Sequence, residues 1–112
     1  MQPDDRVRLL HMIEAIQTAA DFVTGRQAAD LDTDRMLLFA LVRSIEVIGE
    51  AASKVSEETR GLTPDIPWAL IVSMRNRLIH AYFDIDSDIL WKTATIELPA
   101  LLTELQALIK EE

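Results

Sequence analysis

The side chains best suited to chemistry fall within eight residues, from Arg75 to Tyr82. His80, one of two histidines in the chain, can exchange a proton near neutral pH. Arg75 can hold two phosphate oxygens because its planar guanidinium stays charged, and Asn76 can orient the phosphate or the imidazole. A phosphodiester beside a 2'-hydroxyl can be cleaved without a metal if acid-base groups move the two protons and a cation stabilises the phosphate. The residues therefore predict an anion site with an acid-base group.

Two further charged groups belong to this candidate site. Arg77 adds a second anion-binding side chain two residues beyond Arg75. A polar stripe at three- and four-residue spacing runs along a preceding predicted helix and consists of Arg43, Glu46, Glu50 and Ser53. From this stripe Glu46 can set the orientation of Arg75 or Arg77, and the alternative is a solvated polar face.

Taken alone, an arginine, a histidine and a tyrosine near a helix end form a structural hydrogen-bond cluster more often than a catalytic site.

Other reactive side chains lack such neighbours. His11 is expected to be an ordinary surface or packed residue, and Trp68 and Trp91 are expected in the core. Two distant histidines lack the spacing of metal ligands, so we predict no metal site.

The elements that must position these groups are helices. Apolar residues recur every three or four positions, and turn residues such as Gly25 separate the periodic segments. Asp32 or Thr33 is expected to cap the second helix, and Pro67 and Pro99 to lie in the first turns of later ones. The pattern predicts helices over residues 3–23, about 33–57, 68 to just beyond 82, 89–96 and 98–109. We expect one domain over residues 1–112, an all-α up-and-down bundle of four main helices plus one short helix.

Two features of the predicted helices bear on packing. Residues 36–42 are apolar on every side, which is typical of a helix with more than one partner. Gly49 in a helix interior indicates either a close approach by another element or a tolerated glycine.

In a continuous helix Asn76 and His80 would share one face, whereas Arg75 would lie roughly 140° round from His80.

Composition restricts the class of protein. Of the 112 residues, 49% are hydrophobic and 27% charged, with three Gly and four Pro, which disfavours all-β folds and long loops. No cysteine is present and no basic-then-apolar leader begins the chain, so we expect a cytoplasmic protein without disulfides. Arg43 and Glu46 interrupt the longest apolar stretch, which excludes a membrane span there. The net charge of −8 disfavours broad nucleic-acid binding but permits a local basic groove.

The sequence also resembles a known family. Arg75-x4-His80-x-Tyr82 resembles the signature of HEPN ribonucleases, and residues 74–84 closely resemble the HepT-like branch. The similarity extends over nearly the whole chain, and its further segments are residues 43–51, Ile66-Pro67-Trp68, Trp91 and Leu98-Pro99.

This resemblance implies a HEPN-like fold and a metal-independent endoribonuclease without a cofactor, acting on tRNA or mRNA and not on DNA. The protein would be the toxin of a type VII toxin–antitoxin system, a homodimer in which Arg75 and His80 of both subunits face one cleft. The antitoxin would be a minimal nucleotidyltransferase that transfers AMP to Tyr82, with a larger hetero-oligomer as one form of the pair. The added bulk and negative charge beside His80 would block RNA.

Two rival interpretations stay open at this point. The same bundle could be a noncatalytic module that holds a nucleotide or docks a nucleotidyltransferase, which the acidity of the chain favours. It could also be a purely structural dimerising bundle, in which case the motif has no chemical role.

Overall fold

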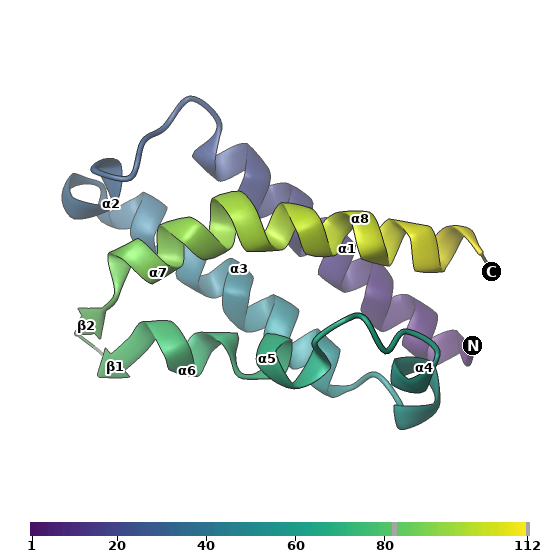
Figure 1. Cartoon of the computed structure of the whole chain (residues 1–112). Coiled ribbons are helices and arrows are strands. Elements are labelled where there is room, and N and C mark those ends of the chain that lie inside the picture. Colours follow the sequence, from purple (N-terminus) through teal and green to yellow (C-terminus); the bar gives the residue numbers. More distant parts are fainter. Residues whose placement is uncertain (82, 112) are drawn as a thin grey trace.

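Four helical rods carry most of the chain, and the computed structural model describes residues 1–81 and 83–111 (Figure 1). The rods are α1 (Pro3–Val23); α3 (Arg35–Ser53); α5 (Trp68–Val72) with α6 (Met74–Leu78); and α7 (Ser87–Lys92) with the π-helical turn η1 (Thr93–Glu97) and α8 (Leu98–Lys110). Between them lie the short helices α2 (Asp30–Thr33) and α4 (Glu57–Gly61) and the antiparallel strands β1 (Ile79–Ala81) and β2 (Asp84–Ile85). The predicted all-α bundle of four main helices is confirmed.

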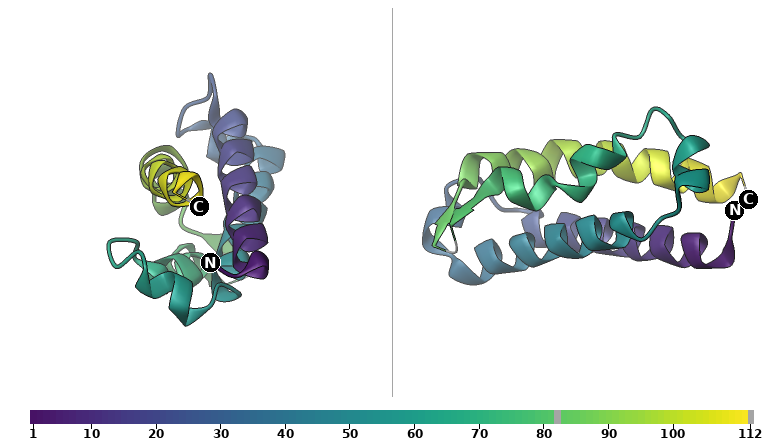
Figure 2. Two further views of the ribbon diagram at one scale, coloured as in Figure 1. Left: turned by 90° about the vertical axis from the view of Figure 1, so that its right-hand side faces the viewer. Right: turned by 90° about the horizontal axis from the view of Figure 1, so that it is seen from below.

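The apolar stripes of the rods form the core. α1 packs mainly against α3 and also against α8, while α5 and α6 lie along α3 (Figure 2). The fully buried side chains of α1 and α3 recur at helical spacing and are Leu9, Met12, Ile16, Leu41, Ile45 and Ile48. Within the described residues, no helix is long and apolar enough to cross a membrane.

The two ends of the bundle differ. The β-hairpin and α2 lie at one end, and both chain termini lie at the other (Figures 1 and 2). Residues 79–81 of the predicted motif thus lie at the end of the bundle away from the termini.

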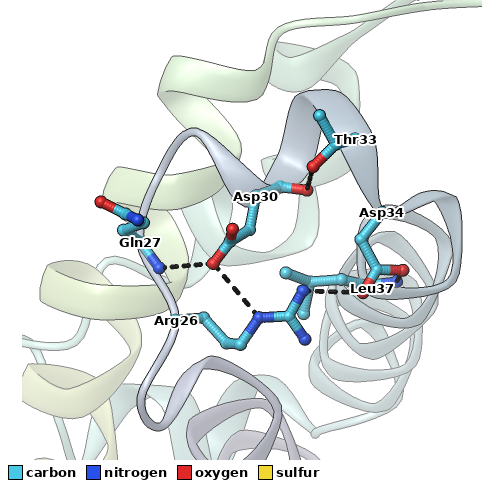
Figure 3. Close-up of polar contacts among 6 residues, drawn as sticks. All are labelled: Arg26, Gln27, Asp30, Thr33, Asp34 and Leu37. Atoms are coloured by element: carbon cyan, nitrogen blue, oxygen red, sulfur yellow. Dashed lines mark hydrogen bonds and ion pairs between the residues drawn. The ribbon is translucent and has the colours of Figure 1, made fainter.

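The start of α3 differs from the prediction. Asp34 caps this helix by accepting a hydrogen bond from the Leu37 N–H at 3.1 Å, so the prediction of Asp32 or Thr33 was wrong. The reason is that residues 30–33 form a helical turn of their own, α2. Arg26 holds this corner through Asp30 at 3.2 Å and Asp34 at 2.7 Å (Figure 3). The hydrogen bond from Arg26, together with that from Leu37, lowers the pKa of Asp34.

The end of α3 also differs, because the helix stops at Ser53 rather than near Glu57. Ser56 caps the separate helix α4 by accepting from the Thr59 N–H at 3.3 Å. Ser56 in turn donates to the buried Asp5 of α1, from its N–H at 2.9 Å and from its hydroxyl at 2.5 Å. Thr59 adds a third hydrogen bond to Asp5 at 2.6 Å. A buried carboxylate therefore ties the chain turn after α3 to α1.

We expect Asp5→Ala to lower the free energy of unfolding at neutral pH by about 2–4 kcal/mol, because three donors lose their buried acceptor. Burial alone would raise the pKa of Asp5, but the hydrogen bonds from Ser56 and Thr59 outweigh it, and the pKa is lowered. A lowered folded-state pKa stabilises the fold above the unfolded value of about 3.9, and this stabilisation is lost as pH falls through the folded-state value. Urea unfolding from neutral pH to below pH 4 measures both effects. Asp4→Ala, at the exposed neighbouring position, is the control, and an equal loss in both variants would contradict the buried network.

Gly49 lies where α5 approaches α3 most closely. A Cβ atom at this position would lie 3.3 Å from the carbonyl oxygens of both Ile71 and Val72. Of the two interpretations open from the sequence, the structure supports close packing. This contact sets how near the third rod, which carries Arg75, lies to α3.

We expect Gly49→Val to destabilise the protein by about 1–3 kcal/mol, because a branched side chain must push the α5 backbone away. Gly49→Ala should be closer to neutral, since the gain in helix propensity of about 1 kcal/mol offsets part of the crowding. Thermal unfolding measures both. Gly61 has no atom within 4 Å of an added Cβ, so Gly61→Val serves as the matched control. Equal shifts in melting temperature at the two glycines would overturn the packing argument.

The third rod is shorter than predicted. It begins after Pro67, which precedes the first helical residue instead of lying within the first turn, and it breaks at Ser73 between α5 and α6. It ends at Leu78, so the prediction of an end just beyond Tyr82 was wrong. The Asp86 N–H donates to the Leu78 carbonyl at 2.7 Å and Ile79 pairs with Ile85. The backbone after Leu78 thus forms a hairpin in place of further helical turns.

The fourth rod joins two helices that the sequence analysis separated. The predicted short helix near residues 89–96 continues through η1 into α8, and Pro99 lies in the first turn of α8 as predicted. Pro99 has no N–H to donate to the carbonyl four residues earlier. The wider π-helical turn just before it lets the rod continue without a break.

Candidate active site

Arg75 is exposed on the first turn of α6 and faces α3. Its Nε lies 3.0 Å from Oε2 of Glu46, which extends from α3 and is partly exposed. The close approach of the rods at Gly49 brings the two side chains within reach. The polar stripe on α3 had two possible roles from sequence alone, and this contact places Glu46 against Arg75 rather than in free solvent.

The same stripe borders a hollow beside Arg75. The hollow has a volume of about 320 Å³ and lies between α3 and the third rod. Its polar lining side chains are Arg43, Glu46, Glu50, Ser53 and Arg75. Arg75 therefore stands at the edge of an open, polar concavity that an anion can enter.

Arg77 lies on the opposite side of α6. Its Nη2 lies 3.3 Å from Oε1 of Glu97 in η1, and its Nε is buried without a hydrogen bond to any described residue. Residues two apart on a helix point in nearly opposite directions, so the structure does not bring Arg77 together with Arg75. It connects the third rod to the fourth.

His80 occupies the middle of β1, with 53% of its side chain exposed. Its Nε2 lies 3.8 Å from Oδ2 of Asp86. Asp86 is itself fixed, because Oδ1 accepts from the Ile89 N–H at 3.0 Å and caps α7. The hairpin and the cap of α7 thus hold a carboxylate beside the imidazole. No spacing in the sequence predicted the pairing of Asp86 with His80.

The other two predicted site residues are Asn76 and Tyr82. Asn76 is exposed on α6, where its backbone N–H donates to the Ser73 carbonyl and its side-chain amide has no hydrogen bond to a described residue. Because α6 ends at Leu78, Asn76 and His80 are not one turn apart on a continuous helix. Tyr82 lies outside the described residues.

The remaining predicted positions agree with the structure in part. His11 is exposed on α1, Trp68 is buried, and Trp91 packs partly buried against the core. Across residues 1–81 and 83–111, no three acidic or histidine side chains converge as metal ligands would.

Comparison with known proteins places this arrangement in a family. The sequence model of a family described as ribonuclease HepT-like matches residues 12–108. The chain belongs to the HepT-like ribonuclease family. The match covers α3, α6, the hairpin and α7, the elements that hold the candidate site.

Proteins similar over most of their length have related names. A protein of Thermococcus cleftensis named probable ribonuclease HepT is 37% identical over 97 residues, which cover 87% of this chain and 88% of that protein. A protein of Caldanaerobacter subterraneus whose name marks it as an inferred RNase is 34% identical over 107 residues, 96% of each chain. Another so named, from Methanocaldococcus jannaschii, is 32% identical over 108 residues, 96% of this chain and 89% of that one. No solved structure matches the chain significantly.

Proposed function

We propose that this HepT-like protein is a metal-independent endoribonuclease that cuts tRNA or mRNA with Arg75 and His80, without a cofactor. The observation that carries the proposal is that both side chains are exposed and a carboxylate lies beside each, Glu46 at 3.0 Å from Arg75 and Asp86 at 3.8 Å from His80. Cellular RNA is in the cytoplasm, and we place the protein there.

The reaction that fits these groups is transfer of the phosphodiester to the neighbouring 2'-oxygen. The 2'-oxygen forms a bond to phosphorus as its proton leaves, and the bond from phosphorus to the 5'-oxygen breaks as that oxygen gains a proton. In the proposed dimer, His80 of one subunit removes the first proton or supplies the second, and His80 of the second copy would do the other. Arg75 stabilises the charge on the phosphate oxygens, and Asn76 orients the phosphate.

The ion pair between Glu46 and Arg75 suits this role. Both side chains are partly exposed, and such a pair contributes little net stability. A phosphate can therefore displace Glu46 from the guanidinium of Arg75, or bind beside Glu46, at a small cost in free energy. Glu46 keeps Arg75 extended toward the hollow before RNA binds, and Arg77 supports the same segment from the other side.

The proposed protein is a homodimer, and the exposed face of α3 supports this part of the proposal. Met36 and Phe39 are 84% and 53% exposed, and they continue the stripe of Arg43 and Glu46 at helical spacing. A second copy of the chain is the occupant that would cover these apolar side chains and bring two sites to one cleft.

The protein is in our proposal the toxin of a type VII toxin–antitoxin pair. A minimal nucleotidyltransferase would silence it by transferring AMP to Tyr82, two residues from His80, with a larger hetero-oligomer as the neutralised form. We expect coexpression with an adjacent nucleotidyltransferase gene to add the mass of one or more AMP units to the wild-type chain and none to Tyr82→Phe. An unmodified chain in a neutralised pair would exclude AMP transfer as the mechanism.

Expression without a partner tests the nuclease proposal in cells. Wild type should arrest growth and degrade cellular RNA, whereas His80→Ala and Arg75→Ala should do neither at equal protein levels. Growth with intact RNA in the wild type would favour the noncatalytic module instead.

A further inference from the structure

A second hollow system adjoins the site on the α1 side. A concavity of about 370 Å³ lies between α1 and α3, and one of about 240 Å³ continues from it. Both include His11, Arg43 and Val47 in their lining, and Arg43 also lines the hollow beside Arg75. Together the two concavities follow the seam of α1 and α3, and we name them the α1–α3 groove.

The charge of this region is opposite to that of the molecule. The groove and the hollow beside Arg75 contain four of the chain's 11 basic residues and three of its 19 acidic ones. The four cations are Arg8, Arg43, Lys54 and Arg75. Among the described residues, Arg8, Arg43 and Lys54 have no ion-pair partner. A cluster of unpaired cations in a chain of net charge −8 leaves them available to an anion from outside.

The groove also offers an apolar surface with an aromatic ring. Phe22, 38% exposed near the end of α1, lines the larger concavity. Lys54 lines the other concavity at the end of α3. From Ala40 to Lys54 α3 rises about 21 Å, enough for a few nucleotides. Cations that meet phosphates beside an aromatic ring that stacks on a base are the pattern of single-stranded nucleic-acid binding.

We infer that the α1–α3 groove binds the single-stranded RNA next to the cleaved phosphodiester. Arg43, at the junction of the three concavities, passes the strand from Arg75 onto the groove. Arg8 and Lys54 contact its phosphates, and Phe22 stacks on a base. The inference takes RNA as the ligand from the proposed function and adds the surface that holds it.

Binding is tested with a fluorescent oligouridylate on the full chain carrying His80→Ala, so that the probe stays intact. Lys54→Glu and Arg8→Glu in this background should each raise Kd roughly tenfold. Each should also reduce the magnitude of the slope of the logarithm of the association constant against the logarithm of salt concentration by about 0.7. This is the value for one lost phosphate contact on a single strand. Phe22→Leu should raise Kd without changing the slope.

The matched control is Lys110→Glu, which reverses a lysine in the last turn of α8 and should leave Kd within about twofold of the parent. Melting temperatures confirm that each variant is folded. Groove variants that bind as the control does, or a parent that does not bind the probe at low salt, overturn the inference. If wild type cleaves RNA but the groove variants bind normally, the inference alone fails. If the groove variants lose binding but wild type never cleaves, the nuclease proposal alone fails.

Discussion

Replacing His80 with alanine is expected to lower kcat/KM for RNA cleavage by about 10²–10⁴-fold, the usual contribution of a positioned acid-base group. The imidazole is accessible to substrate and lies beside Asp86, and Ala removes it without disturbing the core because the side chain is largely exposed. Melting temperature should therefore change little. A fluorogenic RNA substrate measures the rate.

The matched control for this prediction is Asp88→Ala, which removes a neighbouring exposed titratable side chain on α7. It should retain the wild-type rate within a few fold. If His80→Ala and Asp88→Ala cleave RNA equally well, His80 has no catalytic role and the assignment of the site is wrong.

Replacing Arg75 with alanine is expected to lower the rate by about 10²–10³-fold, as expected for loss of one group that stabilises the transition state. Arg75→Lys should recover only part of this loss, because an ammonium keeps the charge but cannot hold two phosphate oxygens in a planar fork. Glu46→Gln should have a smaller effect than either, since it removes only the negative charge beside Arg75 and leaves the guanidinium. Single-turnover rates at saturating enzyme separate these effects from weaker binding.

Arg6, an exposed cation on α1 without an ion pair to a described residue, supplies the control for the loss of one positive charge. Arg6→Ala should cleave RNA at nearly the wild-type rate. If Arg75→Lys cleaves RNA at the full wild-type rate, positive charge alone is sufficient at this position. The proposal that the guanidinium holds two phosphate oxygens would then be wrong.

The long helices were predictable from the sequence because their cores have a simple period. Leu9, Met12 and Ile16 in α1 recur at the spacing of one helix face, and the predicted bounds of α1 agree with the structure. The turn at Gly25, with φ of 74°, was also predictable, because a glycine just after the last apolar residue of a helix commonly ends it. Glycine adopts this conformation without steric cost.

The end of the third rod was not predictable in the same way. Residues 74–82 read as a helix locally, but the hydrogen bond from Asp86 to Leu78 and the pairing of Ile79 with Ile85 compete with further helical turns. Both contacts join residues that helical periodicity does not relate. The pairing of His80 with Asp86 was missed for the same reason, because it exists only once the hairpin has formed.

The contact of Glu46 with Arg75 was only partly predictable from the sequence. The stripe on α3 was visible as a spacing, and a role beside the basic motif was one of two alternatives. Only the close approach at Gly49, where an added Cβ would lie 3.3 Å from two carbonyl oxygens of α5, decides between them. The assignment of Arg75 and His80 to cleavage stays a prediction.

Incubation of purified wild type and His80→Ala with RNA in the presence of excess chelator tests the central claim most directly. The proposed chemistry predicts cleavage by wild type alone, with 2',3'-cyclic phosphate and 5'-hydroxyl ends on the products, because the 2'-oxygen displaces the 5'-oxygen. Cleavage that stops on metal removal, products with 5'-phosphate ends, or equal cleavage by both proteins would contradict it.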